Sequence, residues 1–234
     1  MASRRVAEIL RAAWADSPDG TDLLASLATA CTRSLPVSGV GLALMTDTGP
    51  AGTIAATDGA AVELEHLQFT LGEGPCVDAS KTGRPVLQPD LALTAPPRWP
   101  AFAHGALRAG IRAVFAFPLR VGAIRLGVLD LYRDEAGSLS PDELTEALSF
   151  ADAATLVLLH AQAGSPVPGA VPVLDERAEV HQATGVVSVQ AGVGLADALV
   201  LLRARAFAEE RPLADLARDV LAGAVDFSDA DGDG

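Results

Sequence analysis

The segments GIRAVFAFPL (110–119) and IRLGVLDLYR (124–133) decide the fold of this chain. Both carry the β-branched and aromatic residues that strands favour. Only a short break at Val121–Gly122 separates them, and a break of this length with a glycine is typical of a hairpin between antiparallel strands. The sequence therefore predicts two paired strands, over 113–120 and 124–132, in an antiparallel sheet.

Further elements are expected on the N-terminal side of this hairpin. Two more strands are predicted over 39–45 and 52–57, and the turn between them at 46–50 suits antiparallel neighbours. Ahead of these strands, apolar residues recur at helical spacing in 1–14 and again in 21–35. Two helices are therefore expected before the sheet.

A third helix is expected after the sheet. It should begin at Ser140 and run to about His160, because Ser caps a first turn and Glu143 can bond back to the Ser140 backbone. The segment 71–100 is rich in Gly and Pro and is expected to consist mainly of loops. Helices before and after an antiparallel sheet predict an α+β fold for residues 1–160.

The remainder of the chain divides into three parts. Residues 161–173 contain three Pro and two Gly and predict a linker. Apolar periodicity in 174–223 predicts three short helices, and so a small all-α bundle. Residues 224–234 contain four Asp and little to bury, which predicts a disordered acidic tail.

Composition limits the functions that the chain can have. Its 234 residues carry 17 basic and 30 acidic side chains, a net charge of −13, which excludes a protein that coats nucleic acid non-specifically. Any polyanion must therefore meet a small local patch. Two cysteines are too few for a disulfide scaffold. With no signal peptide and no apolar run long enough to cross a bilayer, we expect a cytoplasmic protein without a membrane partner.

A family resemblance appears when three more segments are added to the two strands quoted first. These segments are LGEGPCVDA (71–79), GRPVL (83–87) and RWPAF (98–102). In this order they resemble a GAF domain, in particular the GAF domains that precede an RNA-binding ANTAR domain in actinobacterial regulators. The resemblance spans about 21–160 and implies a sensor of a small-molecule ligand or a partner, whose identity stays open.

The C-terminal bundle resembles the ANTAR domain itself. The segments that carry this resemblance are HQATGVV (181–187), GVGLADALVLLRARA (192–206) and RPLADLARDVLAG (211–223). The resemblance implies binding of tandem hairpins in nascent RNA and prevention of transcription termination. Because two hairpins need two bundles, it also implies a homodimer, for which we expect contacts through the helices at 1–14 and 141–160.

The RNA-binding residues expected from this resemblance are Gln182, Thr184, Arg203, Arg205 and Arg211. Arg offers forked donors to phosphates and stacks on unpaired bases. The bundle nevertheless has five Arg against eight acids, a net charge of −3. An alternative is that Arg205–Glu209 and Arg211–Asp215 are ordinary surface ion pairs. In that case the bundle of a non-enzymatic regulator would dock a protein partner instead of RNA.

The sensor part offers candidates for a ligand pocket but none for catalysis. Cys76, Trp99, Phe102 and Phe115 could line a pocket between the sheet and the middle segment, with core packing as the alternative for each. Redox catalysis by Cys76 would need further cysteines in a defined arrangement, and the histidines are scattered. We therefore expect no enzymatic activity, no metal and no cofactor.

Overall fold

The computed structural model describes residues 2–18, 20, 22–46, 49–162 and 174–228. The chain divides into two compact units, residues 1–171 and 172–234, and each is described by itself. Parts of three predicted segments lie outside the described residues. They are residues 47–48 of the first turn, 163–173 of the linker and 229–234 of the tail.

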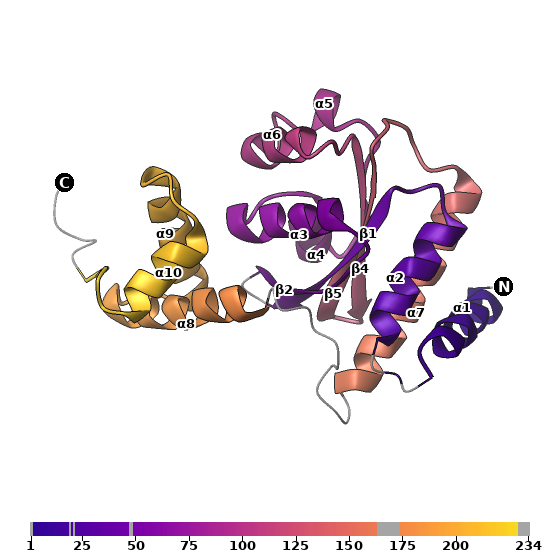
Figure 1. Cartoon of the computed structure of the whole chain (residues 1–234), viewed down its shortest axis with the longest axis horizontal. Helices are drawn as coiled ribbons and strands as arrows, with labels where there is room; N and C mark the ends of the chain where they lie inside the picture. Colours follow the sequence, from indigo (N-terminus) through magenta and orange to yellow (C-terminus); the bar gives the residue numbers. More distant parts are fainter. Residues whose placement is uncertain (1, 19, 21, 47–48, 163–173, 229–234) are drawn as a thin grey trace. The chain divides into compact units, whose positions relative to one another are not determined.

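The first unit is built on a five-stranded sheet in the order β2-β1-β5-β4-β3, with every neighbouring pair antiparallel (Figure 1). The strands are β1 (Gly39–Thr46), β2 (Gly49–Ala56), β3 (Val86–Gln88), β4 (Ala113–Val121) and β5 (Ile124–Arg133). The predicted hairpin is present, since Val121 pairs with Ile124 at its tip. β5 is the middle strand, and its residues from Leu126 to Tyr132 are buried.

The three helices that the sequence predicts lie on one side of the sheet, where the second and third pack on the strands and the first packs on these two helices (Figure 1). They are α1 (Ala2–Asp16), α2 (Leu23–Ser34) and α7 (Pro141–Gln162). Their apolar side chains, Cys31 of α2 among them, share a core with alternate residues of the strands, such as Leu42, Phe115, Phe117 and Leu131. Burial of these residues is the main force that holds the helices on the sheet.

The predicted start of α7 is confirmed. The Ser140 backbone N–H donates to Glu143 Oε2 at 2.7 Å, and the Glu143 N–H donates to Ser140 Oγ at 3.2 Å. This reciprocal pair satisfies two donors that the first helical turn leaves free, and it lowers the pKa of Glu143. By length and composition α7 could also cross a membrane, but here it packs against β4, β5 and α2.

The opposite face is covered by further helices, some of them within the segment that the sequence predicted to consist mainly of loops. They are α3 (Gly59–Leu71), α4 (Pro75–Thr82), α5 (Leu91–Thr94) and α6 (Pro100–Arg108). The expectation of a loop-rich segment over 71–100 was therefore wrong. The residues that suggest turns start helices instead: the Asp90 side chain accepts from the Ala92 N–H at the start of α5, and Pro75 lies in the first turn of α4.

The second unit is the predicted three-helix bundle, formed by α8 (Leu174–Gln190), α9 (Leu195–Ala208) and α10 (Leu213–Leu221). Each helix contributes one buried face to a shared interior. The buried residues include Val180, Ala183, Val187, Leu199, Leu202, Leu213, Leu216 and Val220.

The prediction of a disordered tail was wrong for residues 224–228. Phe227 is buried, and its backbone N–H donates to the Gln190 side chain at 3.3 Å. A single aromatic residue among the aspartates thus docks this part of the tail on the bundle, because its ring gains by leaving water.

Candidate functional site

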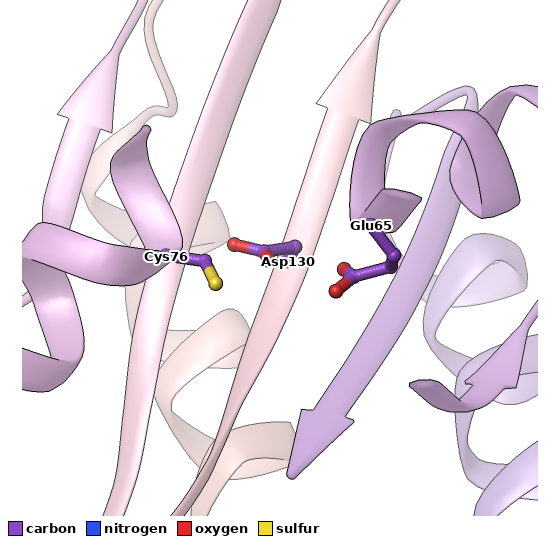
Figure 2. Close-up of side chains that lie close together, drawn as sticks. All are labelled: Glu65, Cys76 and Asp130. Atoms are coloured by element: carbon purple, nitrogen blue, oxygen red, sulfur yellow. The ribbon is translucent and has the colours of Figure 1, made fainter. Parts of the chain in front are cut away.

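Three side chains that can ligate or titrate meet beneath the middle strand of the sheet. Glu65 comes from α3, Cys76 from α4 and Asp130 from β5, and they point toward one another (Figure 2). One ligand atom from each lies within 4.8 Å of the other two. Each residue is at most 2% exposed. We call these three residues the buried acidic cluster.

Glycines leave the space that the cluster occupies. A Cβ at Gly41 on β1 would lie only 2.4 Å from Glu65 Oε1, so the carboxyl lies against bare backbone. Gly74 has φ +130°, and a Cβ there would lie 2.8 Å from Gln68 Oε1. The glycine before Pro75 in LGEGPC is therefore required by both its backbone and its neighbour.

Gln68 ties the cluster together with both ends of its amide. Its Nε2 donates to Asp130 Oδ2 at 3.0 Å, and its Oε1 accepts from the Cys76 N–H at 2.7 Å. Burial raises the pKa of Asp130 to about 6, while its contacts with Glu65, Gln68 and Cys76 act in the opposite direction. The cluster is therefore fixed in position and strongly desolvated.

In the bundle, two arginines converge on one acid at the turn between α9 and α10. Arg205 Nε donates to Glu209 Oε1 at 2.8 Å, and Arg211 Nη1 lies 3.5 Å from Glu209 Oε2. Arg211 also donates to Asp219 Oδ2 at 2.6 Å. Hydrogen bonds from Arg205 and Arg211 lower the pKa of Glu209. This surface therefore presents two guanidinium groups whose partners are carboxylates near solvent.

The docked tail contacts one of these arginines. Arg205 Nη1 donates to the Asp226 carbonyl oxygen at 2.9 Å, and its guanidinium carbon lies 5.0 Å from the centre of the Phe227 ring. The tail thus occupies an N–H donor and the planar face of the Arg205 guanidinium, which are the groups that bind phosphates and stack on bases.

Comparison with known families identifies both units. A family model described as GAF domain matches residues 19–158, and one described as ANTAR domain matches residues 173–221. The chain belongs to the GAF-domain family. Its two-domain order, GAF followed by ANTAR, is that of signal-responsive regulators of the ANTAR type. No curated protein matches it.

Solved structures support the fold of the GAF domain. The GAF domain of a phosphoenolpyruvate-protein phosphotransferase from Coxiella burnetii is 17% identical with a TM-score of 0.50, covering 68% of this chain and 96% of its own. An N-acylhomoserine lactone dependent transcription factor of the LuxR family from Burkholderia cenocepacia is 21% identical with a TM-score of 0.51, covering 70% and 99%. At these identities the likeness concerns the fold alone.

The expected ligand-pocket residues of the GAF domain are distributed over both faces of the sheet. Phe115 lies on the face of the sheet that α2 and α7 cover, whereas Cys76, Trp99 and Phe102 lie on the opposite face. Trp99, one of the expected pocket-lining residues, is 3% exposed and packs edge-on against Phe102, with ring centres 6.1 Å apart. Only Cys76 of the four belongs to the buried acidic cluster.

Sequence reasoning missed the other two members of this cluster, Glu65 and Asp130. Asp130 has a signal in the sequence, because it is a carboxylate within the otherwise apolar run LGVLDLY, whereas Glu65 lies in AAVELEHL beside Glu63 and His66 and has none. An acid in a buried strand is rare unless it is paired or ligates something. That signal was available, but the fold was needed to show that α3 and β5 meet.

The expected RNA-binding residues of the ANTAR domain also separate. Arg205 and Arg211 come together and Gln182 is exposed, but Thr184 is buried and its hydroxyl donates to the Val180 carbonyl at 2.7 Å. The assignment of Thr184 to a binding surface was therefore wrong. Its face of α8 packs inward, together with Val180, Ala183 and Val187.

Arg203 does not join the other two arginines. Two positions along a helix differ by about 200°, so Arg203 and Arg205 lie on opposite sides of α9. Burial lowers the pKa of Arg203 to about 10, which still leaves it charged at neutral pH. The expected three-arginine patch is thus reduced to Arg205 and Arg211. The expected Arg211–Asp215 pair is also replaced, since Asp215 pairs with Arg218.

Proposed function

We propose that this protein is a signal-responsive regulator of transcription antitermination, in which the ANTAR domain binds hairpin RNA. The observation that carries the proposal is the convergence of Arg205 and Arg211 at the α9–α10 turn. Their carboxylate partners are near the surface, where an ion pair is worth little and a phosphate can replace it. The proposed RNA-binding surface contains only these two arginines, and a small basic surface is what we expect in an acidic chain that does not bind RNA non-specifically.

The proposal includes a homodimer, because tandem hairpins require two ANTAR domains. An apolar hollow of about 390 Å³ supports it, lined by Val6, Ala7, Leu10, Val121, Asp152, Thr155, Leu156 and Leu159. Leu156 is 50% exposed there although it lies in the middle of α7. The hollow belongs to α1 and α7, the helices expected to form the dimer contact, and a second copy would cover it.

The GAF domain acts as the sensor in this proposal. A ligand or partner that prefers one arrangement of the dimer shifts its population, and so changes how the two ANTAR domains are presented to RNA. The proposed protein works in the cytoplasm, where transcripts are made, and catalyses no reaction.

A gel-shift assay with the full chain tests RNA binding. The probe is an RNA with two short hairpins, and the control probe has the same composition without hairpins. We expect Arg205→Ala and Arg211→Ala each to weaken binding about tenfold and to lower the slope of log K against log salt by about 1. Arg33→Ala removes the same charge from an exposed pair with Asp16 in the GAF domain, and should leave binding unchanged.

Two outcomes of this assay would contradict the proposal. Equal binding by all four proteins would refute the assignment of Arg205 and Arg211. No binding by the wild type, at low salt and with either probe, would favour the second candidate function, a bundle that docks a protein partner. The acidic balance of the ANTAR domain is the observation that favours this second candidate.

A further inference from the structure

The buried acidic cluster places two carboxyl groups and a thiol close together in an interior away from solvent. Asp130 is fully buried, and the groups that contact it are Glu65, Gln68 and Cys76, none of which is a cation. Carboxylates removed from water in this way need a proton or a positive ion between them.

A second observation points into the cluster from Asp130. Its Oδ2 accepts from Gln68, but no N–H or hydroxyl group of the described residues donates to its buried Oδ1, and the remaining groups that contact the carboxyl are the Glu65 carboxyl and the Cys76 thiol. The Asp130 side chain lies between Cys76 and Glu65 (Figure 2). Burying a carboxylate oxygen costs free energy unless a proton, a water molecule or a bound ion interacts with it.

We propose that Glu65, Cys76 and Asp130 bind a divalent transition-metal ion of intermediate softness, of which Zn²⁺ and Fe²⁺ are the common examples. Two carboxylate oxygens and one thiolate are suitable donors for these ions. Neighbouring ligands of a tetrahedral ion lie roughly 3.5 Å apart, since the metal–ligand distances are about 2.0–2.3 Å. Separations within 4.8 Å therefore need only small side-chain shifts to close on the ion.

Binding would change the proton content of the cluster. The Cys76 thiol, and any carboxyl that is protonated, must release its proton to solvent as the metal–ligand bond forms. Gln68 would hold two of the ligand residues from outside, because it bonds the Asp130 carboxylate and the Cys76 N–H. Three protein ligands leave a fourth position for water or a small molecule.

Co²⁺ titration of the metal-free full chain tests the proposal, with metal analysis of the purified protein beside it. A thiolate bound to Co²⁺ absorbs in the near ultraviolet, so the spectrum reports the ligand and not adventitious binding to surface acids. We expect about one equivalent of Co²⁺ with this band in the wild type. Cys76→Ser should abolish the band, whereas Cys31→Ser, the other buried cysteine, should keep it.

Asp130→Asn and Glu65→Gln keep the shape of the cluster and remove charge, so they are expected to fold, which circular dichroism checks. Each should weaken Co²⁺ binding by about 100-fold or more, since loss of a supporting residue alone costs about 10–100-fold. A wild type without the thiolate band would overturn the proposal. So would Cys76→Ser and Cys31→Ser proteins with the same spectrum. If the Glu65 and Asp130 carboxyls only share a proton and bind no metal, the wild type will lack the thiolate band.

Discussion

The two domains place their charged groups in opposite ways. The GAF domain buries Glu65 and Asp130 beneath its middle strand, away from solvent. The ANTAR domain keeps Arg205 and Arg211 at its surface, each paired with an acid. A buried carboxylate can change state only with a proton or a bound cation, whereas a surface ion pair can exchange its partner. The difference suits a sensor that responds internally and a binding domain that acts at its surface.

The largest expected effect comes from disturbing the buried side of this comparison. Gly41→Val should lower the free energy of unfolding of the GAF domain by about 2–3 kcal/mol, because its Cβ would lie 2.4 Å from Glu65 Oε1 in a packed interior. Urea unfolding measures this loss. Gly59→Ala is the matched control, since a Cβ at Gly59 meets nothing within 4 Å. Equal losses in the two variants would show that Glu65 does not need the space at Gly41.

The next effect concerns the surface side, where the tail contacts Arg205. Deleting residues 224–234 should tighten RNA binding about three- to tenfold at low salt, because Arg205 loses the Asp226 carbonyl and the Phe227 ring. Replacing Asp229, Asp231 and Asp233 by Asn removes most of the charge and leaves these two contacts. If this second variant binds as tightly as the deletion, tail charge and not docking controls Arg205.

The turn between Arg205 and Arg211 offers a smaller test. Glu210 has φ +49°, a left-handed conformation that glycine adopts more easily, whereas α8 ends with Gly192 at φ +67°. Glu210→Gly should raise the free energy of unfolding of the ANTAR domain by about 0.5–1 kcal/mol, and Gly192→Ala should lower it by about 1 kcal/mol. Thermal unfolding checks both. Changes of the same sign would show that these two helix ends are not equivalent.

The smallest effect is expected at Thr184. Thr184→Val keeps the side-chain shape and removes a hydroxyl that bonds only within α8, so RNA affinity should change less than about twofold. A loss like that of Arg211→Ala in the gel shift would return Thr184 to the binding surface.

Much of the fold could be predicted from the sequence because its signals are local. Strand composition on both sides of Val121–Gly122 and the capping box at Ser140 depend on neighbouring residues only, and both are confirmed. The helices of the middle segment were missed because Pro75 and Asp90 belong to residue types that start helices and turns alike.

The site residues were harder to predict because they depend on contacts between distant parts of the chain. The side of α8 that carries Thr184 faces inward only because α9 and α10 pack there. Phe227 looked like part of an acidic tail until the bundle gave it a surface to bury against. Glu65, Cys76 and Asp130 lie far apart in sequence, and only the fold brings them together.

The central claim is that this GAF–ANTAR protein binds hairpin RNA in nascent transcripts through Arg205 and Arg211. Sequencing of RNA crosslinked to the protein in cells tests it most directly, with the wild type compared with an Arg205→Ala, Arg211→Ala double variant. We expect enrichment of transcripts with paired hairpins upstream of terminators in the wild type, and loss of that enrichment in the variant. Equal recovery of the same transcripts by both proteins, or no enriched transcript in the wild type, would contradict it.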